Sequence, residues 1–149
     1  MTSITTLALQ SSWPLSEQGR KFELGRILDS VVVDQLVPDQ VGEVGPHHAG
    51  CWECNLSDNS LIWSGAVYDL FGFARGSTIS RDHAAGLYCE DSRVKMENLR
   101  RHAIDHLRGF TIDVQIQPAF AERRWMRLVA APVCVDGRAV RLHGLKLAI

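Results

Sequence analysis

The spacing of hydrophobic and polar positions divides the chain into three parts. Residues 1–15 are mostly polar and show no clear periodicity, so we expect a flexible N-terminus. Over residues 16–37, apolar residues recur at three- and four-residue steps, the spacing of one face of an amphipathic helix. Residues 38–49 contain several Pro and Gly residues and predict a connector. A folded domain is expected from residue 50 to 149.

Within residues 50–149 the pattern first predicts a hairpin and then helices. Short apolar runs at 51–56 and 60–64 are typical of strands, and the polar residues between them favour a turn. Helical spacing follows over 66–73, and Ser80 is a candidate cap for a short helix through residue 87. A longer helix is expected over 92–107, and we expect Gly109 to end it.

The last forty residues have the period of two that is typical of half-buried strands. Residues 110–117 alternate apolar and polar side chains, and further strands are expected over 123–135 and 139–149. Asp136-Gly137 is a pair favoured in two-residue hairpin turns. The order predicts one five-stranded antiparallel sheet with helices on one side, an α+β fold.

Composition and charge narrow the class of protein. The chain has 149 residues, 46% of them hydrophobic and 22% charged, which is typical of a soluble globular domain. A net charge of −1 removes the electrostatic case for nucleic-acid binding. The longest apolar run, 128–135, is too short to span a membrane, and no basic segment leads into an apolar one at the N-terminus. We therefore expect a cytoplasmic protein that binds neither nucleic acid nor membrane.

Cys51 and Cys54, with His47 and His48 upstream, have the spacing of a zinc or redox motif. The flanking residues favour a strand, however, and side chains three positions apart in a strand point to opposite faces. We therefore predict no metal site at this pair.

Several motifs, in order along the chain, resemble those of the PAS sensory domains. Gly50-Cys-Trp52-Glu53-Cys-Asn-Leu56 is similar to the G-x-W-E-x-D-L opening strand of one subgroup, with Asn55 where Asp is usual. The resemblance continues over residues 50–149 through Ile62-Trp63-Ser64, Tyr68-Asp-Leu-Phe-Gly-Phe73, Tyr88-Cys-Glu-Asp-Ser-Arg93, Trp125-Met-Arg127 and Leu142-His-Gly144.

The resemblance implies a small apolar pocket between the sheet and the helices, able in this family to hold haem, flavin or a metabolite, or to be filled by side chains. Alternation and the family's layout together give ten candidate pocket residues, which are Leu56, Tyr68, Phe71, Leu87, Leu99, Ile112, Val114, Trp125, Val129 and Leu142. Helices that flank the core form dimer contacts in the family. This implies a homodimer with candidate interface residues Leu24, Ile27, Leu28 and Val31.

Two cofactors can be weighed against the sequence. The Asn-Cys-Arg-Phe-Leu-Gln motif of flavin photoreceptors is absent from the chain, which argues against a flavin–cysteine adduct. Haem would need an axial ligand, and His102 and His106 lie on the predicted long helix. Their helical positions favour the surface, so haem stays an alternative that we do not favour, and the cofactor is left open.

No group of side chains in the sequence forms a recognisable catalytic set, so we predict no enzymatic activity. One alternative is a small α+β enzyme like the ketosteroid isomerases, although their strand order fits less well. Because the chain ends directly after the last predicted strand, no output domain is expected in cis. The sequence thus predicts a sensory module that acts through a small-molecule ligand, its own dimerisation or a signalling partner in trans.

Overall fold

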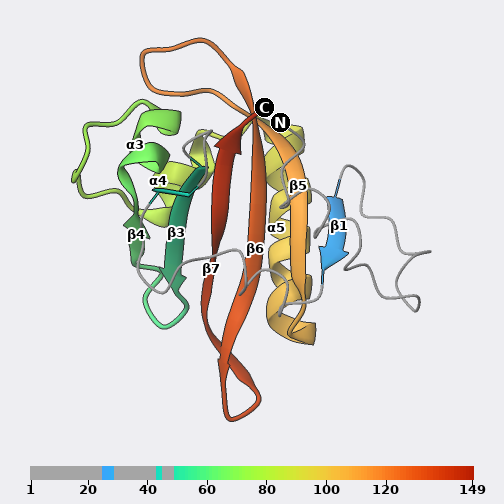
Figure 1. The fold of residues 1–149 in the computed structure, drawn as a ribbon. Helices are drawn as coiled ribbons and strands as arrows, with labels where there is room; N and C mark the ends of the chain where they lie inside the picture. The colour runs from blue at the N-terminus through green and yellow to red at the C-terminus, as the bar shows by residue number, and fades with distance from the viewer. Residues whose placement is uncertain (1–24, 29–42, 45–48) are drawn as a thin grey trace.

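A single antiparallel sheet is the centre of the fold. In a computed structural model of the chain, the described residues are 25–28, 43–44 and 49–149. The strand order is β1-β5-β6-β7-β3-β2, and β4 pairs with β3 (Figure 1). The strands are β1 (Gly25–Leu28), β2 (Glu43–Val44), β3 (Ala49–Asn55), β4 (Leu61–Trp63), β5 (Gly109–Ile116), β6 (Arg124–Val135) and β7 (Arg138–Ala148).

Five of these strands, β3 to β7, confirm the predicted sheet. The helix expected over 16–37 does not run through Gly25–Leu28, because these residues form β1 and pair with β5 in antiparallel register. The edge of β5 offers unpaired backbone groups, and Gly25 weakens a helix at this point. The segment therefore pairs with β5 as a strand. Ile27 and Leu28 thus lie in a strand. The rest of that span, with Leu24 and Val31, and residues 1–15 lie outside the described residues.

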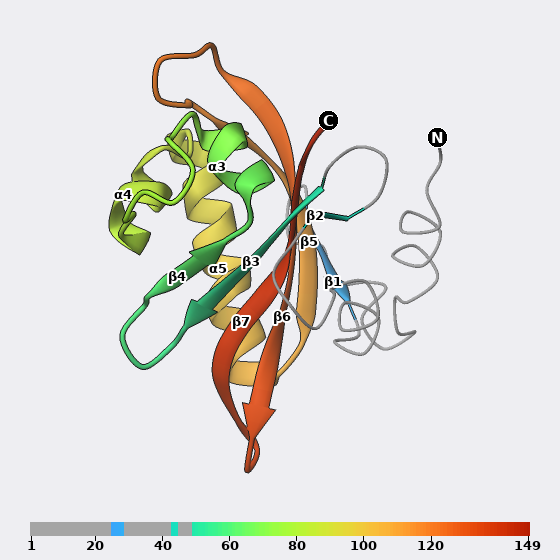
Figure 2. The same cartoon turned by 60° about the vertical axis from the view of Figure 1, so that its left-hand side comes forward.

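Three helices cover one face of the sheet. Figure 2 shows α3 (Gly65–Phe71), α4 (Arg81–Gly86) and α5 (Glu90–His106) on the same side of it. As predicted, Ser80 caps α4, and its Oγ accepts a hydrogen bond of 3.1 Å from the His83 N–H. The end of α5 differs from the prediction, since Leu107 ends the helix in the left-handed region (φ 57°) two residues before Gly109. None of the described helices is long and apolar enough to cross a bilayer.

The hydrophobic core lies between this helical layer and the sheet. Alternate residues of β5, beginning with Phe110, are buried there, as are Leu99 and Ala103 of α5. The rings of Trp63 and Phe71 stack with centroids 4.9 Å apart, and the Phe71 and Tyr88 centroids lie 6.1 Å apart. These aromatic contacts join β4, α3 and the segment after α4, so large rings fix one end of the core.

The turn between β6 and β7 confirms the predicted hairpin. Asp136 and Gly137 both have positive φ, 52° and 74°, and Val135 pairs with Arg138 across them. This is the geometry of a two-residue turn whose twist matches that of the flanking strands.

Gly144 allows β7 to lie against β6. A Cβ at this position would overlap the carbonyl oxygen of Val129 and would lie 2.7 Å from its carbonyl carbon. The neighbours are backbone atoms of a central strand, which cannot move without disturbing the ladder.

We therefore expect Gly144→Ala to lower the free energy of unfolding by about 3 kcal/mol through overpacking. Gly86→Ala is the matched control, because its Cβ would meet nothing within 4 Å and α4 would gain roughly 0.5–1 kcal/mol. Urea denaturation of both variants measures the difference. Equal stability of the two would contradict the close approach at Gly144.

Candidate ligand-binding site

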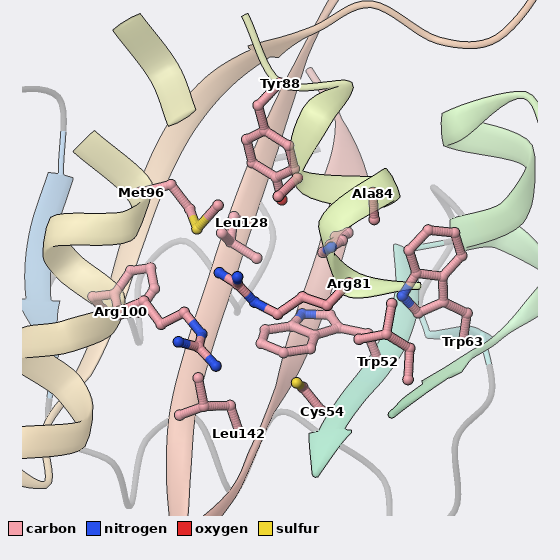
Figure 3. A pocket seen from close by; sticks show the side chains of 14 residues that line it. Trp52, Cys54, Trp63, Arg81, Ala84, Tyr88, Met96, Arg100, Leu128 and Leu142 are labelled. Atoms are coloured by element: carbon pink, nitrogen blue, oxygen red, sulfur yellow. The ribbon is translucent and has the colours of Figure 1, made fainter. Parts of the chain in front are cut away.

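A cavity of about 60 Å³ lies between the helical layer and the sheet (Figure 3). This volume exceeds what a single buried water needs, so a small ligand or several waters fit. The walls come from β3 to β7, from α4 and α5, and from the segment between the two helices. The lining residues are Trp52, Cys54, Leu61, Trp63, Arg81, Ala84, Ala85, Tyr88, Met96, Arg100, Phe110, Leu128, Leu142 and Lys146.

Lys146 is the most unusual of these residues, because it is a buried cation in an aromatic surround. Only 7% of its surface is exposed. Its Nζ lies 5.2 Å from the ring centroid of Trp52, 5.4 Å from that of Trp63 and 4.9 Å from that of Phe71. A fourth ring, that of Tyr88, has its centroid at 5.9 Å. Ring faces attract a cation and favour the ammonium form.

Burial acts in the opposite direction on Lys146. The pKa of the amine falls from its ordinary value of 10.5 to about 7, chiefly because the group is removed from water; Cys54 raises this pKa, and the positive charge of Arg81 lowers it. Among the described residues no carboxylate forms an ion pair with Nζ. The site therefore holds a cation whose desolvation is only partly offset by the rings.

Two arginines bring further positive charge to the cavity wall. Arg81, in the first turn of α4, forms an ion pair with Glu97 of α5. Arg100 lies one helical turn after Met96, so both reach the cavity from the same face of α5, and its guanidinium donates a 3.3 Å hydrogen bond to Asn59 Oδ1. Figure 3 shows both guanidinium groups among the lining side chains. The Arg81–Glu97 ion pair also joins α4 to α5 beside the cavity.

The Trp63 indole is a donor without a partner. Trp63 is 8% exposed, and its Nε1 is buried with no hydrogen-bond partner. Figure 3 shows this nitrogen turned toward the other lining side chains. By contrast, Trp52 Nε1 donates to the carbonyl of Leu145 at 3.3 Å. A buried unpaired N–H costs about 1–3 kcal/mol, which an acceptor in the cavity would recover.

A wider surface depression of about 610 Å³ adjoins the cavity. Leu61, Trp63 and Arg81 line both spaces, so these side chains form the boundary between them. The depression continues over residues 58–60 and 76–82.

The ten pocket residues expected from the sequence divide into three groups. Buried core residues form the first group, in which Leu142 lines the cavity and Phe71, Leu99, Ile112 and Val114 do not. Partly buried residues that pack against the same core make up the second group, which contains Leu56, Tyr68 and Leu87.

Trp125 and Val129 form the third group, and their placement corrects the expectation. Strand β6 directs Met126 and Leu128 into the core, so the odd-numbered residues beside them face the other side of the sheet. Trp125 is 44% exposed, and Val129 is buried outside the core cluster.

The sequence carried a weak signal for the residues that were missed. Lys146 follows Leu142 and Gly144 at steps of two, so it occupies an inward position of the last strand. A lysine in the same phase as the candidate Leu142 is the available signal, but lysine is almost always exposed, so its residue type argues against an inward position. Arg81 and Arg100 lie on helices whose polar residues usually face solvent, so nothing in the spacing separated them from surface charges.

The histidines and cysteines can now be placed. The described lining of the cavity contains neither His102 nor His106, whose rings lie 4.5 Å apart on α5. Cys54 lies in the core, and Cys51, also buried, lies outside that cluster, consistent with opposite faces of β3. No disulfide joins the four cysteines, and no three metal-binding side chains are grouped in the part of the chain that the structure describes.

Comparison with known proteins identifies the fold. The N-terminal domain of a diguanylate cyclase with a PAS/PAC sensor from Marinobacter aquaeolei matches with a TM-score of 0.60 and 18% identity, over 66% of this chain and 92% of that chain. The fold is the PAS fold. A domain of a putative light and redox sensing histidine kinase from Haloarcula marismortui matches with a TM-score of 0.59 and 17% identity, over 66% of this chain and 87% of that chain.

A third PAS-fold neighbour is an RNA-binding light-oxygen-voltage receptor, with a TM-score of 0.59 and 14% identity. The match covers 67% of this chain and 29% of that chain, so this chain corresponds to less than a third of the receptor. No family model matches the sequence, and no curated protein matches it. At these identities the likeness concerns the fold alone, which confirms the expected PAS architecture.

The buried amine gives a test of the site through stability. The unfolded chain holds its Lys146 proton up to about pH 10.5, whereas the folded chain releases it near pH 7. Between these values the unfolded state binds more protons, so the stability of the native protein rises with pH. We expect Lys146→Met to stabilise the fold by about 2 kcal/mol at pH 7, because a buried charge is replaced by an apolar side chain of similar length.

The gain should shrink as the pH approaches 10, because the stability of the wild type rises throughout the range between the pKa values of Lys146 in the folded and the unfolded chain. Urea unfolding of both proteins at pH 7, 8.5 and 10 measures this trend. Lys95→Met, on α5 and outside the cavity, is the matched control. Destabilisation by Lys146→Met at pH 7 would show that the amine supports the fold.

Proposed function

We propose that the chain is a sensory module in which a small molecule bound in the cavity is the input signal. The observation that carries the proposal is a cavity in which Lys146 has no carboxylate partner among the described residues and Trp63 Nε1 has no acceptor. Groups that cost free energy in the unoccupied protein are stabilised by a ligand. The names of two neighbours of the same fold, a PAS/PAC sensor and a light and redox sensing kinase, support a sensory role.

The walls of the cavity indicate how the effect of ligand binding is transmitted to the surface of the domain. The sheet supplies one side, and α4 and α5 supply the other through Arg81, Ala84, Met96 and Arg100. A ligand that contacts Arg81 competes with its ion pair to Glu97, which joins the two helices. The proposal is one of binding without catalysis, and the response passes to a second copy or to another protein.

The proposal predicts that filling the cavity blocks binding. A panel of acetate, acetamide, propylamine and 2-propanol samples anionic, neutral and cationic ligands small enough for a cavity of about 60 Å³. We expect at least one member to shift the Trp63 Nε1–H signal in a two-dimensional amide NMR spectrum. Ala85→Phe places a ring in the cavity and should weaken that binding at least tenfold, because the ring occupies the ligand's volume.

Ala74→Phe is the control, because Ala74 is exposed and lies outside the cavity. It should bind as the wild type does. A well-dispersed wild-type spectrum in which no member of the panel moves the Trp63 signal would contradict ligand sensing at this site.

We propose that the domain forms a homodimer and that the dimer contact carries the output signal. If Ile27 lies at a contact between two copies, Ile27→Asp would force a carboxylate out of water there and should convert a dimer into a monomer. Sedimentation velocity measures the change, with Val94→Asp on the exposed side of α5 as control. A monodisperse dimer of Ile27→Asp would count against this interface.

A further inference from the structure

We infer that the ligand of this cavity is an organic monocarboxylate, whose carboxylate lies against Lys146 and Trp63 Nε1 and whose apolar body fills the remaining space. The inference rests on the proposed function and specifies the ligand class of the same site. It follows from the charge, the hydrogen-bonding groups and the lining of the cavity, taken in turn.

The charge of the cavity is the first argument. Three of the fourteen lining residues are cationic, Arg81, Arg100 and Lys146, and none is acidic. Glu97 neutralises Arg81, but Lys146 has no carboxylate partner among the described residues. An ion pair strengthens as water is excluded, so an anion placed beside Lys146 gains far more than it would at the surface. A neutral or cationic ligand leaves this charge uncompensated.

The hydrogen-bonding groups point to the same class of ligand. The Lys146 ammonium and the Trp63 indole N–H can only donate, and Trp63 Nε1 has no acceptor in the protein. An ionised carboxylate only accepts, and its two oxygens have about four lone-pair positions. Donors on the wall and acceptors on the ligand are complementary, whereas an ammonium ligand would place donor against donor.

The remaining lining determines the rest of the molecule. Around the cationic end lie Leu61, Met96, Phe110, Leu128 and Leu142, together with the ring of Trp52. Such a wall favours an apolar body by about 25 cal/mol for each Å² that it removes from water. A phosphate is polar on every side, so it would leave these apolar side chains without an apolar partner.

Protonation of Lys146 adds a dependence on pH. Burial brings the pKa of its amine to about 7, and only the ammonium form attracts a carboxylate. The charged and titratable groups facing it are Arg81 of α4, Tyr88 after α4, Arg100 and Glu97 of α5, and Cys54 of β3. Tyr88 remains protonated because burial raises its pKa well above the ordinary value of 10. Carboxylate affinity should therefore fall as the pH rises from 6.5 to 8.5.

The experiment compares two ligands of equal shape. Acetate and acetamide differ in charge and in donor groups, and isothermal titration calorimetry at pH 6.5 gives the dissociation constant of each. We expect acetate to bind at least tenfold more tightly than acetamide. Lys146→Met should abolish this preference, while Lys95→Met should keep it. Circular dichroism verifies that each variant is folded.

A second variant tests the hydrogen bond. Trp63→Phe keeps a ring at the wall but removes the N–H, and should weaken acetate binding about fivefold. Equal binding of both ligands, or an undiminished preference for acetate in Lys146→Met, would overturn the carboxylate assignment while leaving ligand sensing intact. Absence of binding by the whole panel would overturn both.

Discussion

The pairing of β7 with both β3 and β6 is the constraint on which the rest of the structure depends. It joins Gly50–Asn55 to a strand more than eighty residues later and sets which side chains face the helices. In this register Trp52 pairs with Gly144 and Cys54 with Leu142. A shift of one residue would turn Lys146 to the opposite face and bring Leu145 and Leu147 into the core. The candidate site thus exists only in the observed register.

The same register explains why a cavity can persist beside a dense core. Strand β7 contributes Leu142 and Lys146 to the wall, and the residue between them on this face, Gly144, has no side chain. Gly144 is required for the approach of β7 to Val129, so the close contact between strands and the space on the helical side arise together. A larger residue there would change both the sheet and the cavity.

The fold could be predicted from the sequence where local signals and long-range packing agree. Alternation over residues 110–117, the Asp136-Gly137 turn and the Ser80 cap each require only neighbouring residues, and each is confirmed. The segment at Gly25–Leu28 was different, because apolar steps of three and four suit a helix while the open edge of β5 accepts a strand. Pairing with a strand more than eighty residues away leaves no mark in local spacing.

The site was less accessible to sequence reasoning than the fold, because its residues contradict the usual relation between polarity and exposure. Leu142 was found since it is apolar and lies in a strand, whereas Lys146 is a lysine at an inward position. Alternation and the family's layout point to Trp125, but the phase of β6 turns it away from the core.

A sequence specifies its fold when the preference of each residue agrees with its place in the structure. A residue that violates this agreement therefore needs an explanation other than stability. For Lys146 the rings of four aromatic residues offset part of its burial, and the remainder is a cost that the folded protein carries whenever the cavity has no anion. A ligand carboxylate removes that cost only when bound. The free energy lost in the unoccupied state then becomes part of the binding energy, which connects the residue least suited to the core with the proposed sensory role of the domain.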